Sequence, residues 1–211
     1  MTIDPKRDLP PVEQHPLQPF LPPNGRLLML GSFPPQQKRW ARNFCFYYPN
    51  FTNDMWRVLG LVFYADPLHF VDVAAKTYRR PLIEEFLLCQ GIGIYDTASA
   101  VRRLQDNASD KFLEVVTPTD VESLLRQMPQ CRTLVTTGQK ATDTICQRFG
   151  IGQPQVGSYV EFAMPAISAE GRDVPMVRLY RMPSTSRAYP LPLAQKAAVY
   201  RSMFAELGFE V

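Results

Sequence analysis

Short apolar runs alternate along the chain with segments in which apolar residues recur every three or four positions. A continuous apolar run predicts a strand buried in a parallel sheet, and the three-to-four spacing predicts an amphipathic helix. The predicted strands are 26–31, 92–96, 131–137 and 174–181, and the predicted helices are 53–64, 81–89, 121–128, 138–149 and 193–207. This alternation predicts an α/β fold, a three-layer α/β/α sandwich around a central, mainly parallel four-stranded sheet.

Two connecting segments are candidates for a functional site. Residues 32–52 are rich in aromatic and basic side chains, and they exceed the roughly 12 to 15 residues of ordinary loops. Residues 183–192 follow the last predicted strand. Ligands of such sheets bind beyond the carboxyl ends of the strands, where both segments begin. The connection 97–118 is expected to be a polar loop, and the proline-rich stretch 1–24 is expected to be an extended arm without a catalytic role.

The composition is that of one globular domain spanning residues 1–211. No apolar run approaches the roughly 20 residues of a membrane span, and the first residues lack the apolar centre of a secretory signal. We therefore expect a cytoplasmic monomer with no membrane partner. The net charge of +3 permits contact with phosphate without requiring it. Four cysteines without paired spacing and two histidines argue against a zinc or iron–sulfur site, so we expect no metal or other cofactor.

Four motifs follow one another along the chain: GSFPPQQKRWARNFCFYYPNFTNDMW, GIGIYDTASAVRR, TLVTTGQKA and MPSTSRAY. In this order they resemble the uracil-DNA glycosylase superfamily, most closely its mismatch-specific and hypoxanthine (deoxyinosine) branches. The likeness covers the chain from about His15 to the closing helix. It implies a uracil-DNA glycosylase-like fold, damaged or mismatched DNA as the partner, and hydrolytic removal of a base in base-excision repair without a cofactor.

The first motif contains the groups that the resemblance implies for catalysis and base binding. Gly31 and Pro34 shape a turn in which the backbone N–H groups of Ser32 and Phe33 would stabilise charge on the departing base. An enzyme that acts on a base in duplex DNA flips it out of the stack and holds it by stacking. The candidate stacking side chains are Phe33, Tyr47 and Tyr48. The alternative interpretation is that the glycine and prolines only form a tight turn.

Phe33 departs from the superfamily pattern, because many relatives carry Asp or Asn there to orient the attacking water. Asn53 matches the asparagine that has this task in the hypoxanthine branch, so the resemblance implies that Asn53 is catalytic. Asn is also among the best residues at a helix N-cap, and Asn53 stands at the start of a predicted helix. The capping role is the alternative, and the two roles are compatible.

The last motif contains a second departure. Met182 stands where many relatives carry His or Asn to bind the base carbonyl, which leaves purine substrates or very low activity open. Ser184 is the candidate for this base contact. The residues of the motif that are expected to contact DNA are Thr185, Ser186 and Arg187. An ordinary helix-capping loop is the alternative.

Basic residues extend the expected DNA interface. Lys38, Arg39 and Arg42 lie among aromatic residues, a mixture that suits a DNA backbone beside an exposed base. A solvated basic loop would have the same composition. Arg103 is expected to be a surface charge, and Asp96 is expected only to support other residues.

The sequence thus predicts a monofunctional DNA glycosylase, and it leaves the excised base open. A second interpretation comes from a different class. Because Phe33 and Met182 replace polar groups of the superfamily, the chain could be a non-catalytic protein that binds nucleic acid or a nucleotide and retains the fold.

Overall fold

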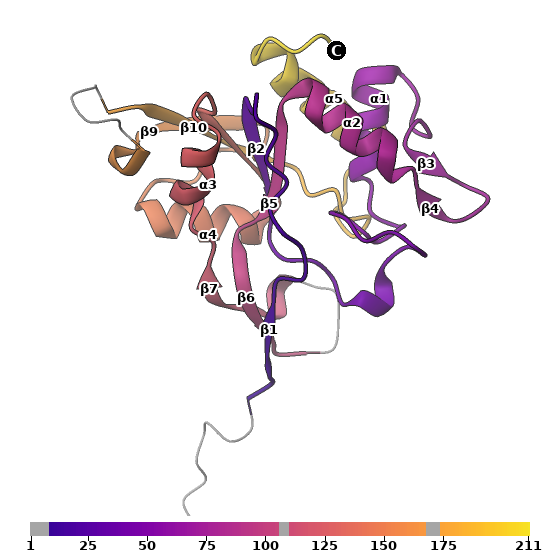
Figure 1. Cartoon of the computed structure of the whole chain (residues 1–211), viewed down its shortest axis with the longest axis horizontal. Helices are drawn as coiled ribbons and strands as arrows, with labels where there is room; N and C mark the ends of the chain where they lie inside the picture. Colours follow the sequence, from indigo (N-terminus) through magenta and orange to yellow (C-terminus); the bar gives the residue numbers. More distant parts are fainter. Residues whose placement is uncertain (1–8, 106–109, 168–173) are drawn as a thin grey trace, which may run out of the picture.

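The computed structural model describes residues 9–105, 110–167 and 174–211. Its central sheet lies between two groups of helices (Figure 1). The strands, in spatial order, are β5 (Ile92–Asp96), β2 (Leu27–Gly31), β8 (Thr133–Thr137), β10 (Met176–Met182) and β9 (Ser158–Ala163). The first four are parallel, and β9 pairs antiparallel with β10. The four predicted strands are confirmed, and β9 is an additional edge strand that makes the sheet five-stranded.

Five α-helices lie within the described residues, and each begins and ends within two residues of its predicted bounds. They are α1 (Met55–Tyr64), α2 (Arg80–Gln90), α3 (Val121–Gln127), α4 (Gln139–Phe149) and α5 (Leu193–Glu206). Helices α1, α2 and α5 gather on one side of the sheet, and α3 and α4 on the other (Figure 1). No helix in the described ranges has the length and apolar character needed to cross a membrane.

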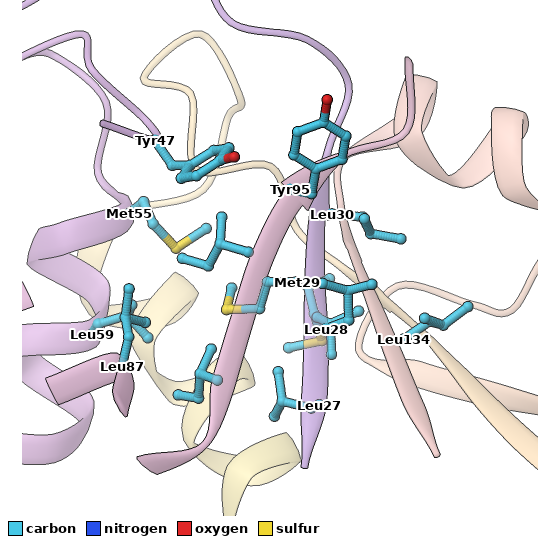
Figure 2. Packing of buried hydrophobic residues seen from close by; sticks show 14 of the residues in the cluster. Leu27, Leu28, Met29, Leu30, Tyr47, Met55, Leu59, Leu87, Tyr95 and Leu134 are labelled. Carbon is cyan, nitrogen blue, oxygen red and sulfur yellow. The ribbon is translucent and has the colours of Figure 1, made fainter. Parts of the chain in front are cut away.

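The core includes β2, where Leu27, Leu28, Met29 and Leu30 are fully buried. This burial follows from the position of β2, which pairs with a parallel strand on each edge and is covered on both faces. Burying one such side chain contributes about 1.5 to 3 kcal/mol. Figure 2 shows Tyr47 beyond the carboxyl end of β2, so the loop after β2, residues 32–52, closes that end of the core.

A second sheet was not predicted. Its strands, in spatial order, are β1 (Val12–Gln14), β6 (Ala98–Arg103) and β7 (Leu113–Pro118), and both pairings are antiparallel. The prediction of a polar loop between β5 and α3 is therefore wrong. The arm contributes β1, and its residues 1–8 lie outside the described residues. A short hairpin, β3 (Val71–Asp72) and β4 (Thr77–Tyr78), follows α1.

Candidate active site

A cavity of about 670 Å³ opens at the carboxyl ends of the parallel strands, and the loops that follow β2 and β10 both line it. The predicted site residues in its lining are Gly31, Ser32, Phe33, Pro34, Tyr47, Tyr48, Asn53, Ser184, Thr185 and Ser186. The predicted DNA contacts outside the lining are Lys38, Arg39, Arg42 and Arg187, and all four side chains are exposed. The two loops that the sequence selected therefore meet in one place.

A buried ion pair fixes the loop after β10, residues 183–192 and here called the late loop, to the start of α1. Lys196 Nζ donates to Asp54 Oδ2 at 3.0 Å and to the carbonyl oxygen of Ser186 at 2.8 Å. The Asp54 N–H donates to the carbonyl oxygen of Thr185 at 2.8 Å. A buried lysine is tolerated only when it is paired in this way. Thr185 is only 1% exposed, which disagrees with its predicted phosphate contact, whereas the exposed Arg187 lies 3.4 Å from Asp54.

Tyr47 and Tyr48, both in the loop after β2, differ in burial and in their hydrogen-bond partners. Tyr47 is buried, and its hydroxyl donates to the Gln18 carbonyl oxygen at 2.6 Å. Tyr48 is half-buried, with its hydroxyl 2.8 Å from Thr137 Oγ1 at the end of β8. Burial raises the pKa of both phenols, so both stay protonated. Tyr48 has a φ of +49°, a strained value for a bulky residue, and strain of this kind is typical of functional sites.

Phe33 packs against the second sheet, although it also lines the cavity. Its ring contacts the second sheet, in a small cluster with Ala98, Val101 and Leu113. Arg103 lies over the same ring at 5.6 Å from its centre and donates to the Pro34 carbonyl oxygen. Because the ring is 8% exposed, it offers little surface to a base. Arg103 is equally buried and pairs with Glu13 at 2.9 Å, so the prediction that it is a surface charge is wrong.

Asn53 lines the cavity and also stabilises the start of α1. Its Oδ1 accepts a hydrogen bond from the N–H of Met55, the first residue of the helix, at 2.9 Å. The N-cap position itself is Asp54. Asn53 thus accepts a hydrogen bond at the helix start, as the capping interpretation requires. It does so from one position before the N-cap residue, Asp54. An amide oxygen has two lone pairs, so the same side chain can still hold a water molecule.

Asp96 and His15 form a buried pair that sequence reasoning missed. Asp96 Oδ2 lies 2.9 Å from His15 Nε2, and their side chains are 9% and 2% exposed. Asp96 lines the cavity, whereas His15 is not among the lining residues. A Cβ at Gly31 would lie 2.2 Å from Asp96 Oδ1, so only glycine permits this close approach. Asp96 thus reaches the cavity itself, and the arm supplies the histidine that orients it.

A second carboxylate, Asp110, lies beside the first motif. Ser32 Oγ donates to Asp110 Oδ2 at 2.7 Å, and both residues line the cavity. The pKa of Asp110 is raised because surrounding protein atoms remove part of its hydration and because Asp96 is a nearby like charge. The cavity therefore contains two carboxylates in different environments. Pairs of acid and base catalysts are found in such an arrangement.

Another part of the lining favours anions. Gly138 precedes α4, and the helix N-terminus, Lys140 and Arg181 all line the cavity. Free N–H groups and the helix dipole attract negative charge there. Gly138 has a φ of +137°, which favours glycine, and it packs against Ser184 of the late loop. Within the described residues, no three His, Cys, Asp or Glu side chains are grouped closely enough to hold a metal ion.

No protein-family model matches the chain, and no curated protein matches it. Among solved structures, the chain is similar to the solution NMR structure of a "putative Uracil DNA glycosylase" from Methanosarcina acetivorans. The TM-score is 0.57 at 19% identity, and the match covers 94% of this chain and 100% of the other. This chain has a uracil-DNA-glycosylase-like fold. The predicted fold class is confirmed, and at this identity the likeness concerns the fold alone.

The uracil-DNA-glycosylase-like fold also shows why some site residues were missed. Asp96 ends the strand beside β2, so its place at the carboxyl edge of the sheet was a usable signal. His15 lies 81 positions from its partner in the sequence. Asp110 lies within the segment 97–118, which was expected to be a polar loop. Local pattern therefore could not place His15 beside Asp96, or Asp110 in the cavity lining.

Proposed function

We propose that the protein is a DNA glycosylase that flips a deaminated or mismatched base out of DNA and hydrolyses its N-glycosidic bond. The observation that carries the proposal is the cavity of about 670 Å³ lined by both strand-end loops of a uracil-DNA-glycosylase-like fold. Ligand pockets for small molecules have volumes of about 300 to 1,000 Å³. A nucleotide that leaves the duplex needs such a pocket, because its reacting atoms are inaccessible inside the helix.

The lining contains a group for each task in this reaction. Tyr48 is the half-buried ring against which a base would stack. Asp96 is an acceptor for an N–H group of that base. The N-terminus of α4, with Lys140 and Arg181, would attract a phosphate beside the flipped nucleotide. Asn53, which already receives the Met55 N–H, would orient the attacking water through its remaining lone pair.

One observation favours a second candidate function. Met182 is 1% exposed and lines the cavity, where the superfamily resemblance would place a polar contact to the base. Without this contact the cavity could bind a nucleotide or a DNA end without cutting it. The second candidate is therefore a non-catalytic nucleic-acid-binding protein with the same fold.

Base excision distinguishes the two candidates. The purified protein is incubated with end-labelled duplexes that contain uracil, hypoxanthine, xanthine or a G·T mismatch, and abasic sites are then cleaved with alkali. We expect a strand break at the altered base that depends on the alkali step. The control is the matched unaltered duplex. If the protein bound an altered duplex tightly and no break formed at any of the four altered bases, the non-catalytic candidate would be favoured.

A further inference from the structure

The first motif lacks an acid of its own at Phe33, yet a carboxylate reaches the same turn from another part of the chain. Asp110 begins the short 3-10 helix Asp110–Phe112, directly before β7. Its Oδ2 accepts a hydrogen bond from the hydroxyl of Ser32, the residue next to Phe33. The two oxygen atoms are 2.7 Å apart. A carboxylate has about four acceptor sites, so this bond leaves capacity to hold a water molecule in the cavity.

Phe33 helps to place this carboxylate. Its ring belongs to the same small apolar cluster on the second sheet as Leu113, the first residue of β7. Leu113 is three positions after Asp110, so this cluster holds the segment that carries the acid near the motif turn. Phe33 cannot orient water itself, but it helps to anchor the segment that carries Asp110.

The charges around Asp110 come from several elements. Asp96 at the end of β5 opposes ionisation of Asp110, whereas Arg103 of β6 and Lys140 of α4 favour it, as does the Ser32 hydroxyl. Loss of hydration is the largest influence, and the net effect raises the pKa of Asp110 above its ordinary value of 3.8. A base whose pKa approaches the working pH takes up a proton more effectively.

We propose that Asp110, oriented by Ser32, is the general base of the reaction, a role that rests on the proposed glycosylase function. The C1′–N bond breaks, and its electron pair goes to the ring nitrogen of the departing base. The oxygen of water forms a bond to C1′, and one proton of that water passes to the Asp110 carboxylate. Asp110 then releases this proton to solvent, and the base anion takes one up.

The test compares Asp110→Asn with Glu114→Gln in single-turnover excision of the base that the wild-type protein removes. Glu114 is a matched control, because it is an exposed carboxylate on β7 that pairs with Arg102 and lies outside the cavity lining. We expect Asp110→Asn to lower the rate at least about 100-fold, a typical contribution of a general base, and Glu114→Gln to leave it unchanged. Asp110→Glu should restore part of the rate.

Two further readouts separate catalysis from folding. The wild-type rate should fall as pH decreases through the raised pKa of Asp110, and Asp110→Asn should lose this acidic limb. Binding to a duplex with a tetrahydrofuran abasic analogue and the melting temperature should not decrease in Asp110→Asn. An active wild type with an equally active Asp110→Asn variant would overturn this inference alone. A wild type that removes none of the four bases would overturn the proposed function, and this inference with it.

Discussion

The loop between β2 and α1 has two parts that differ in burial and in charge. The inner part, residues 32–35, 47–50 and 53, lines the cavity and is fixed by hydrogen bonds to β8, the arm and α1. The outer part carries Lys38, Arg39 and Arg42, whose side chains are exposed outside the lining. Chemistry requires groups held in one geometry, whereas contact with a DNA backbone requires accessible positive charge. We therefore propose that the inner part serves the chemistry and the outer part contacts the DNA backbone.

The largest expected effect concerns Asn53 in the inner part. Asn53→Ala should lower the single-turnover excision rate at least about 100-fold, because a positioned polar group is removed. It should also cost about 1 kcal/mol of stability, since the Met55 N–H loses its partner. Excision kinetics and thermal melting on one preparation measure both. Thr52→Ala, an exposed neighbour, is the control. A variant that melts lower and still cuts at the wild-type rate would leave Asn53 with the helix-start role only.

The next effect concerns stacking by Tyr48. Stacking of a base on an aromatic side chain contributes about 1 to 3 kcal/mol. Tyr48→Ala should therefore weaken binding of a duplex with a non-cleavable altered nucleotide about tenfold or more, and should leave binding of the unaltered duplex unchanged. Tyr48→Phe keeps the ring, removes only the hydrogen bond to Thr137, and should bind like the wild type. Equally weakened binding of both duplexes would mean that Tyr48 shapes the loop and does not contact a base.

A smaller effect is expected from the outer part. Replacing Lys38, Arg39 and Arg42 by alanine should flatten the dependence of log affinity on log salt, by about 0.9 for each phosphate that the protein no longer neutralises. The excision rate at saturating protein should change little, because none of the three lines the cavity. The control is the double variant Arg126→Ala/Arg132→Ala, two exposed cations outside the lining. An unchanged salt slope in the triple variant would assign the outer part to ordinary solvated surface.

The smallest effect concerns stability and pH. The pKa of Asp110 is raised in the folded protein, so the folded state loses stability as pH rises from the ordinary value towards the raised one. Asp110→Asn carries no charge at any pH and should melt slightly higher than the wild type near neutral pH. The difference should be below about 3 °C, because the side chain is accessible to solvent and its charge is screened. At pH values below 3.8 the difference should vanish. A lower melting temperature near neutral pH would contradict the direction of this pKa shift.

The sequence predicted the parts of the molecule that local pattern determines. The strand Leu27–Gly31 was recognisable because every residue in it is buried, so its apolar run is unbroken. The second sheet was missed because β6 mixes buried residues with Ser99 and Arg102 and pairs with the distant arm. The same long-range pairing brings His15 to Asp96. The cavity-lining residues of the two motifs were predicted, and lining residues that tertiary structure delivers, such as Asp110, were not.

We propose that a flipped nucleotide enters the cavity between the loops that follow β2 and β10. The most direct test is a crystal structure of the protein bound to a duplex with a 2′-fluoroarabino analogue of the excised nucleotide, which the enzyme would bind without cutting. We expect an extrahelical nucleotide in the cavity, with its base against Tyr48 and its N-glycosidic bond facing Asn53 and Asp110. A nucleotide that stays stacked in the duplex, or DNA bound to a face remote from this cavity, would contradict it.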